Sequence, residues 1–225
     1  MVTRAAVART AVSVGLATGA YGLSFGALGT AAGLSVAQTW AMSVLMFTGG
    51  SQFALLGVLS GGGSGVSGAA SAVLLGARNA LYAARLKQLL GLHGLRKLLG
   101  AQLIIDESTA VAVSNEQRGV RAGRFGFWST GLSVFVLWNL ATVAGAIAGA
   151  AVGEPQTYGL DAAAPAAFLA LLWPRLTSRA AWLNGTAACL VAIAVVPLVP
   201  AGVPILVAAL VPVAYLALLR DRDAR

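Results

Sequence analysis

The sequence predicts an all-α polytopic membrane protein. Of its 225 residues, 58% are hydrophobic and 10% are charged, whereas soluble domains carry roughly 25% charged residues. Glycine is abundant and aromatic residues make up only 7%, a composition that favours close packing between membrane helices. We therefore expect a single transmembrane domain over residues 1–225, multi-pass, with the lipid of the cytoplasmic (inner) membrane around it.

The apolar segments predict about seven or eight transmembrane helices. A helix that crosses about 30 Å of hydrocarbon needs roughly 20 residues, and polar breaks divide the chain into windows of that order. The first apolar run is longer than that of a signal peptide and has no clean cleavage site, so we interpret it as a retained helix. The expected segments are 10–34, 37–60, 65–86, 98–114, 124–152, 158–174, 179–198 and 201–220.

One or two of these segments are expected to be broken or re-entrant. The 37–60 segment contains the polar stretch "TGGSQ", and the short 98–114 segment contains two adjacent acids. Non-helical backbone at membrane depth is tolerated where protein or a water-filled cavity surrounds it. A weak similarity at an offset near 115 further suggests repeats of about 10–114 and 124–220, and transporters often bind substrate between repeats.

The basic clusters predict an orientation of the chain in the membrane, and one basic loop disagrees with it. If the last four segments cross simply, four clusters all face the cytoplasm, as the positive-inside bias requires. The basic loop at 85–97 then disagrees with three simple crossings before it, unless one early segment does not fully cross. The four clusters lie at 4–9, 118–124, 175–179 and 220–225.

Four charged residues inside apolar sequence need an explanation. Arg78 costs about 2.5–3.5 kcal/mol at a helix centre, so it either extends to the headgroups or pairs with an acid inside the protein. Asp106 and Glu107 are either solvated in a loop, or one pairs with Arg78 and the other, desolvated beside a like charge, carries a coupling proton. Asp161 either caps a helix or lines the transport pathway.

The "TGGSQ" stretch has two interpretations. Two glycines allow a helix to unwind, and the half-helix that follows would offer free N–H groups to a substrate carboxylate. In the alternative, the glycines form a close-packing surface in an unbroken helix, with Ser and Thr bonded to their own turns. The residues of this candidate substrate site are Thr48, Gly49, Gly50, Ser51 and Gln52, together with Arg78.

Several classes of function are disfavoured. The net charge is +8, but the basic residues are dispersed between apolar segments, so we expect no nucleic-acid partner. His93 is the only histidine and there is no GxxxxGK[ST] loop, so we expect no metal site, no cofactor and no enzymatic activity. Tyr21 and Tyr82 are interpreted as hydrogen-bonding groups between helices.

Five stretches together resemble a known family. "GLSFGALGTAAGLS", "MSVLMFTGGSQFALL", "ARNALYAARL", "DESTAVA" and "LDAAAPAAFLALL" are similar, in order and spacing, to the AzlC family of branched-chain amino-acid permeases, the large subunit of LIV-type exporters. The resemblance covers roughly residues 12–195. It departs at Gly76, where the family often has Asn two residues before the Arg that corresponds to Arg78.

The resemblance implies ion-driven export of leucine, isoleucine, valine or related compounds, with a small membrane subunit of the AzlD type. It also places Gln52, Arg78, the Asp106–Glu107 pair and Asp161 on family motifs. We therefore expect a secondary transporter subunit that exports branched-chain or other small hydrophobic amino acids. The alternatives are a channel or transporter for another small solute, such as an organic acid, and a non-transporting membrane scaffold subunit.

Overall fold

The computed structural model describes residues 3–152 and 163–223, which fold into helices with no β-strand among them. Within these ranges, three helical stretches are long and apolar enough to cross a membrane: Arg4–Ala31, Val120–Ala151 and Arg179–Leu198. The all-helical membrane class is therefore confirmed. Seven or eight complete crossings are not confirmed, because several expected segments are divided into shorter helices.

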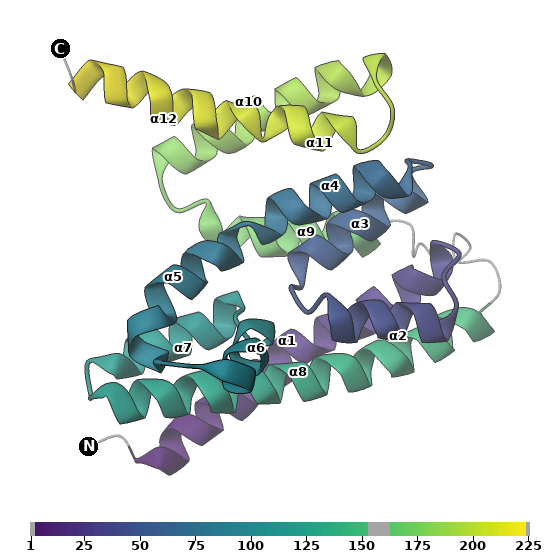
Figure 1. The fold of residues 1–225 in the computed structure, drawn as a ribbon. Helices are drawn as coiled ribbons and strands as arrows, with labels where there is room; N and C mark the ends of the chain where they lie inside the picture. The colour runs from purple at the N-terminus through teal and green to yellow at the C-terminus, as the bar shows by residue number, and fades with distance from the viewer. Residues whose placement is uncertain (1–2, 153–162, 224–225) are drawn as a thin grey trace.

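Helices α1 (Arg4–Ala31) and α8 (Val120–Ala151) form a closely packed parallel pair that is the frame of the molecule (Figure 1). Glycines of α1 lie against α8 at points that advance along both helices: Gly22 lies against Trp138, and Gly26 against Thr142. Small residues let the two backbones approach within contact distance. Lipid provides no hydrophobic driving force for helices to associate, so membrane helices depend on close van der Waals packing of this kind.

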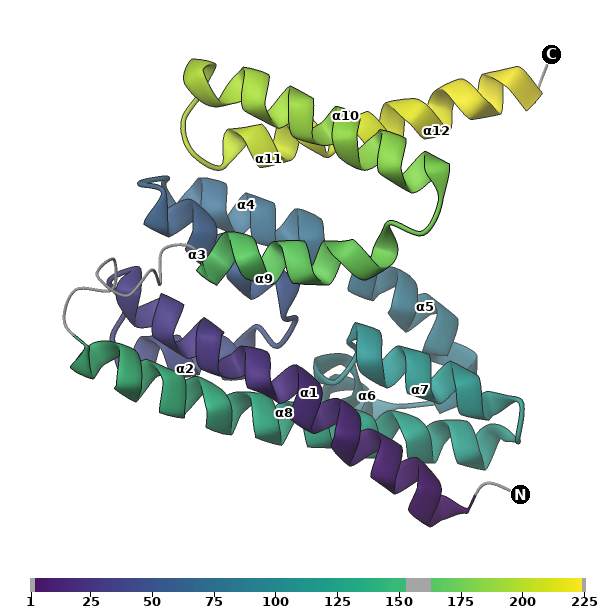
Figure 2. The same ribbon diagram turned by 180° about the vertical axis from the view of Figure 1, so that it is seen from behind.

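The 37–60 segment is broken, as the sequence predicts. Helix α2 (Val36–Leu45) ends at Met46, and α3 (Gly50–Ser60) begins after Gly49, whose φ of +63° is available at little cost to glycine alone. Figures 1 and 2 show that α2 runs toward the middle of the molecule and α3 returns toward the end from which α2 came. The segment is therefore re-entrant.

A second re-entrant pair enters from the opposite end. After α5 the chain runs inward to α6 (Gly94–Gln102), and α7 (Asp106–Glu116) runs back toward the α7–α8 turn (Figure 1). The two breaks touch, because the Gln102 side-chain amide Nε2 donates to the Val44 carbonyl over 2.6 Å. Two interrupted helices thus meet near the centre of the molecule.

The 65–86 segment is not the single helix that was expected. It divides at Ala77 into α4 (Gly65–Gly76) and α5 (Arg78–Leu90), with no proline at the division. Small residues at 76 and 77 make a bend possible, and Arg78 at the start of α5 extends toward the α2–α3 break. The bend therefore places a charged side chain at the centre of the molecule.

The helices after residue 178 form a separate layer beside α4, whereas residues 163–172 lie beside α3 (Figure 2). The expected 201–220 helix is divided at Ala209, because Pro212 has no N–H to bond the preceding turn. Ser67 Oγ of α4 donates to the Ala201 carbonyl and joins the layers. The elements are α9 (Ala163–Leu172), η3 (Trp173–Arg175), α10 (Arg179–Val195), η4 (Val196–Leu198), α11 (Val203–Ala208) and α12 (Leu210–Asp223).

Three contacts gather basic segments at the N-terminal end of the molecule. Arg85 pairs with Glu116, the Arg124 Nε donates to the Leu89 carbonyl, and Arg4 lies over the ring of Phe125. The basic loop 85–97 therefore lies beside the starts of α1 and α8. Because α2 and α3 turn back, this arrangement favours the alternative in which one early segment does not fully cross the membrane.

Candidate functional site

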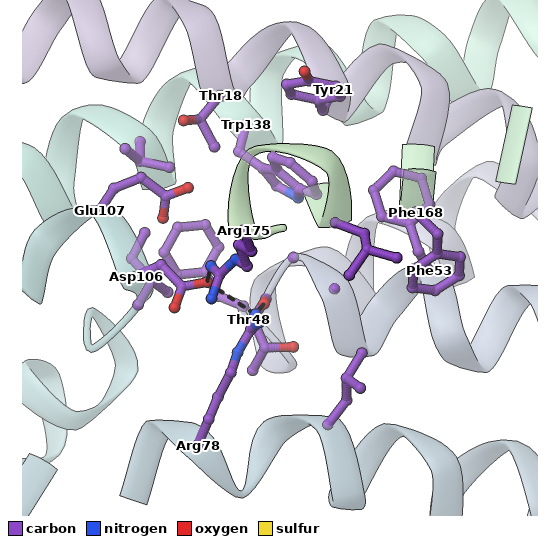
Figure 3. Close-up of a pocket in the computed structure, with 17 residues that line it drawn as sticks. Thr18, Tyr21, Thr48, Phe53, Arg78, Asp106, Glu107, Trp138, Phe168 and Arg175 are labelled. Atoms are coloured by element: carbon purple, nitrogen blue, oxygen red, sulfur yellow. Dashed lines mark hydrogen bonds and ion pairs between the residues drawn. The ribbon is translucent and has the colours of Figure 1, made fainter. Parts of the chain in front are cut away.

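A cavity of about 230 Å³ lies where the two broken helices meet (Figure 3). Its wall combines charged groups from α5, α7 and η3 with aromatic and aliphatic side chains from α1, α3, α8 and α9. The size is below the roughly 300–1,000 Å³ of sites for drug-sized ligands. The lining residues are Thr18, Tyr21, Phe47, Thr48, Gly49, Gly50, Phe53, Leu75, Arg78, Ile105, Asp106, Glu107, Val134, Trp138, Phe168, Leu172 and Arg175.

The first turn of α3 presents free backbone donors to this cavity. The Gly49 N–H donates to Gln52 Oε1 over 3.2 Å, and Gln52 Nε2 donates to the Met42 carbonyl over 3.5 Å. The N–H groups of Gly50 and Ser51 have no acceptor among the described residues, as expected for the start of a helix. An anionic ligand group at Gly50 would satisfy donors that lipid cannot.

Two of the predicted substrate-binding residues do not line the cavity. Gln52 is fully buried and its amide holds the α2–α3 break together. Ser51 is buried on the face of α3 that lies against Gly76 of α4. Successive helical positions point about 100° apart, so Gly50 can face the cavity while the next two side chains pack inward. Gln52 therefore supports the break, whereas Ser51 packs against α4.

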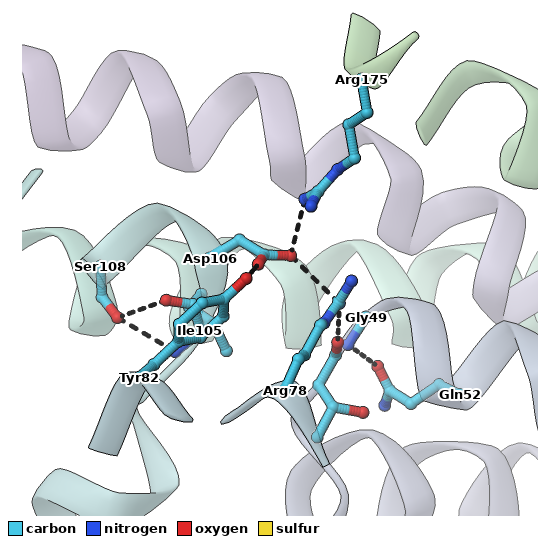
Figure 4. A network of polar contacts seen from close by, with 9 residues as sticks. Gly49, Gln52, Arg78, Tyr82, Ile105, Asp106, Ser108 and Arg175 are labelled. Carbon is cyan, nitrogen blue, oxygen red and sulfur yellow. Dashed lines mark hydrogen bonds and ion pairs between the residues drawn. The ribbon is translucent and has the colours of Figure 1, made fainter. Parts of the chain in front are cut away.

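Asp106 is the centre of a charged network at the first turn of α7 (Figure 4). Its Oδ2 lies 3.1 Å from Arg78 Nη2 and 3.2 Å from Arg175 Nη2, and the Tyr82 hydroxyl donates to its Oδ1. Charge-assisted bonds of this kind are about twice as strong as neutral ones. One carboxylate therefore holds together three elements that are distant in sequence.

The Glu107 side chain lines the same cavity but takes part in no such charged network. No other described residue donates a hydrogen bond or forms an ion pair with its carboxylate. Figure 3 shows its side chain beside the cavity, on the opposite side from Phe53 and Phe168. Two arginines thus neutralise Asp106, and Glu107 is the acid that remains available to a ligand.

Arg78 points into the protein and does not extend to the headgroups. Its Nη2 donates to the Thr48 carbonyl over 3.5 Å as well as pairing with Asp106. Its Nε is buried without a partner among the described side chains and backbone. The guanidinium therefore connects the α2–α3 break to the α6–α7 break.

Aromatic residues form the apolar wall of the cavity. The Phe53 ring meets the Trp138 ring edge to face at a centroid distance of 6.2 Å, and Phe168 packs against Phe53 at 6.3 Å. Trp138 is 2% exposed, and its Nε1–H finds no acceptor in the described part of the chain. The Thr48 hydroxyl is also buried without a hydrogen-bond partner in the described part of the chain. Both polar atoms belong to residues that line the cavity, where a ligand could satisfy them.

Sequence reasoning missed several lining residues and misplaced one. Arg175 was assigned to a cytoplasmic basic loop, but the turn η3 brings it to Asp106. Tyr21 lines the cavity, and Tyr82 does bond between helices, through Asp106. Trp138 and Phe168 carried no signal, because aromatic residues in apolar sequence are also typical of lipid-facing surfaces. Asp161, a predicted coupling residue, lies outside the described residues.

No group of three or more His, Cys, Asp or Glu side chains that could hold a metal ion occurs within residues 3–152 and 163–223. Among the described residues, two carboxylates line the cavity, and one of them is paired with arginines. Its polar groups suit a small charged organic ligand better than a metal ion.

Comparison with known proteins gives one match. A family model described as AzlC protein matches residues 13–152. The matched stretch runs from α1 to the end of α8, so it includes both broken helices and the residues Arg78, Asp106 and Glu107. No curated protein and no solved structure matches the chain.

Proposed function

The chain belongs to the AzlC family, whose members transport small substrates across membranes, and from this membership and the cavity we propose that it is the transporting subunit of an exporter for branched-chain or other small hydrophobic amino acids. One observation carries the proposal. The Gly50 N–H and the Glu107 carboxylate, neither of which has a partner in another described residue, line one small cavity with an aromatic wall.

A zwitterionic amino acid needs both of its charged groups satisfied away from water. The free N–H of Gly50 and the positive end of the α3 dipole suit its carboxylate. Arg78, whose Nη2 lies beside Gly50, adds a positive charge there. Glu107 suits the ammonium group, and Phe53, Trp138 and Phe168 suit a branched aliphatic side chain.

Asp106 and Glu107 are the groups proposed to couple transport to an ion gradient. Because Asp106 is shared by Arg78 and Arg175, its negative charge is neutralised within the protein. Glu107 can therefore bind either a proton or the substrate ammonium, and competition between the two would link their movements.

A small membrane subunit of the AzlD type is the proposed partner, and the cytoplasmic membrane is the proposed location. The stretch Arg179–Leu198, which joins α10 and η4, is long and apolar enough to cross a membrane, yet none of its residues is buried within the described chain. A partner helix could cover this surface. The basic segments gathered beside α1 and α8 would face the cytoplasm.

Transport by the reconstituted complex tests the proposal. Proteoliposomes holding the chain and its partner should show counterflow of labelled leucine and valine, and Arg78→Ala should reduce it at least tenfold, because a charged interaction is worth about 1.5–3 kcal/mol. The matched control is Arg85→Ala, which lies on the same helix but pairs with Glu116 outside the cavity. This variant should retain flux.

The same assay separates the alternatives. The two arginines at the cavity favour an organic acid as the second candidate substrate. Counterflow of a 2-oxo acid without counterflow of any amino acid would replace the proposed substrate class. Undiminished leucine flux in Arg78→Ala would remove this residue from the mechanism, and loss of the partner subunit from that variant would indicate a scaffold role.

A further inference from the structure

A second cleft, of about 640 Å³, lies at the N-terminal end of the molecule, apart from the transport cavity. It is formed by the α5–α6 turn, the start of α6 and the first turns of α8, which Figure 1 shows side by side at this end. Its lining residues are Leu90, Gly91, Leu92, His93, Arg96, Arg124 and Trp128.

Arg124 is held in place over the turn that ends α5. Its Nε donates to the Leu89 carbonyl over 2.8 Å, and its Nη2 would lie 3.0 Å from a Cβ at position 91. Gly91 also has a φ of +57°, which favours glycine. The turn therefore leaves room for a guanidinium whose remaining N–H groups face the cleft.

The cations of this cleft have no acid opposite them. Neither Arg96 nor Arg124 forms an ion pair with a residue in the described ranges, whereas Arg85, at the same end, pairs with Glu116. Arg96 forms no hydrogen bond with another described residue either. Two guanidinium groups in one cleft without a counter-ion favour an anionic ligand.

The cleft changes from cationic to apolar in one helical turn. On α8, Trp128 follows Arg124 by four residues, and both line the cleft. Such a spacing places side chains on one helix face, and α8 runs inward from the basic end (Figure 1). On α6, the 54%-exposed Leu99 follows Arg96 by three residues and lies outside the cleft lining. A cation toward the end of α8 and an aromatic group one turn deeper match the profile of a membrane interface.

We propose that this cleft binds an anionic phospholipid of the cytoplasmic leaflet. Its phosphate lies between Arg96 and Arg124, and an acyl chain lies along Leu99 and Trp128. Basic pockets between membrane helices on the cytoplasmic side bind such headgroups. A free phosphate ion would use the cations but leave the apolar part of the cleft unexplained.

The lipid would also stabilise the second re-entrant pair. The cleft joins α6 to α8, and α6 leads directly to the break before Asp106. A lipid bound across both helices would therefore restrain α6, and its loss would lower thermal stability.

Native mass spectrometry of the purified complex tests this site, with phosphatidylglycerol or phosphatidylcholine titrated in detergent. Phosphatidylglycerol should bind and raise the Tm, and phosphatidylcholine should not. Arg96→Gln should weaken phosphatidylglycerol binding about fivefold, the effect of one basic residue near an anionic lipid surface. Lys97→Gln, the adjacent residue outside the cleft, is the matched control and should bind as the parent does.

Arg96 is the decisive position, because Arg124 also bonds the backbone and its loss could disturb folding. Gly91→Ala gives an independent variant, since it displaces the Arg124 guanidinium without removing a charge. Equal weakening by Lys97→Gln, equal binding of phosphatidylcholine, or equal protection by inorganic phosphate would each overturn the lipid site. A co-purified protein helix in the cleft in place of lipid would overturn it too.

Discussion

Asp106 and Glu107 are neighbours in sequence but have different surroundings. Asp106 forms ion pairs with Arg78 and Arg175 and accepts a hydrogen bond from Tyr82, whereas the Glu107 carboxylate has no partner from another described residue. The first acid therefore fixes the walls of the cavity. The second is the group that a cationic part of a ligand can reach without breaking a bond within the protein.

Glu107→Gln should raise the KM for leucine at least tenfold, because it removes the negative charge that suits the substrate ammonium; such a bond is worth about 1.5–3 kcal/mol. If the protein also transports the 2-oxo acid that corresponds to leucine, which has no ammonium group, the KM for that acid should stay unchanged. The measurement is the concentration dependence of flux in proteoliposomes that contain the partner subunit.

Glu116→Gln is the matched control for this effect. Glu116 ends the same helix, α7, but pairs with Arg85 at the exposed end. Its replacement should leave both KM values unchanged. If the two variants raised the KM for leucine equally, the effect would come from α7 as a whole and Glu107 would have no direct contact with substrate.

The charged part of the site could be predicted from the sequence, and its apolar part could not. Arg78 and the two acids stand out because a charge in an apolar run is expensive unless it is paired. Phe168 and Trp138 give no such signal, since an aromatic side chain costs the same facing lipid or a cavity. Arg175 resembles a headgroup anchor, and only the path of the chain after α9 brings it to Asp106.

At the scale of the helix, the break between α2 and α3 depends on Gly49. Its φ of +63° would strain any other residue, although a Cβ there would meet no atom within 4 Å. Gly49→Ala therefore adds backbone strain of roughly 1–3 kcal/mol and no steric clash. We expect it to reduce leucine flux strongly by shifting the first turn of α3.

Gly33→Ala is the control for the cost of strain alone. Gly33 has a φ of +87°, and a Cβ there also meets nothing within 4 Å, but it lies between α1 and α2, away from the cavity. Both variants should lower the Tm by similar amounts, and only Gly49→Ala should lower flux per folded protein. Equal flux in the two would mean that the shape of the break does not matter for transport.

A helix break can be predicted from the sequence only where the break contains polar residues. "TGGSQ" and the Asp106–Glu107 pair revealed two of them, because lipid cannot satisfy such groups. The bend at Ala77 carries no proline and no polar residue before Arg78, so an apolar window continues across it. The hydropathy of a window shows whether the stretch is apolar enough to cross a membrane. It does not show where the helix changes direction.

At the scale of the whole molecule, the α1–α8 frame has almost no free space. A Cβ on Gly145 would overlap the Leu23 carbonyl of α1, and neither backbone can move without separating the helices. Gly145→Ala should therefore destabilise the protein by about 1–3 kcal/mol, the usual cost of overpacking. A lower Tm in detergent would show this effect.

Gly57→Ala is the control for that substitution. Gly57 lies in the interior of α3, and its added Cβ would meet only the Phe168 ring, at 4.0 Å. It should leave the Tm unchanged or slightly higher, because alanine is the better helix former. A Tm equally low in both variants would show that the loss does not come from the α1–α8 contact.

The two re-entrant pairs are built alike and point in opposite directions. In each, a long or bent helix is followed by an inward helix, a short break and an outward helix, over residues 4–60 and again over 65–116. The caps also correspond: Gln52 Oε1 accepts from the Gly49 N–H, and Ser108 Oγ accepts from the Ile105 N–H. The repeat expected over 10–114 and 124–220 stays a prediction.

This resemblance within the first half has the character of an inverted repeat, which relates one side of a membrane to the other. Two units of similar build need not hold the same conformation at one moment. If each exchanged its conformation for that of the other, a cavity open to one side would become a cavity open to the opposite side. A pseudo-symmetry of this kind would make the two states similar in energy, which would allow a transporter to return after each cycle.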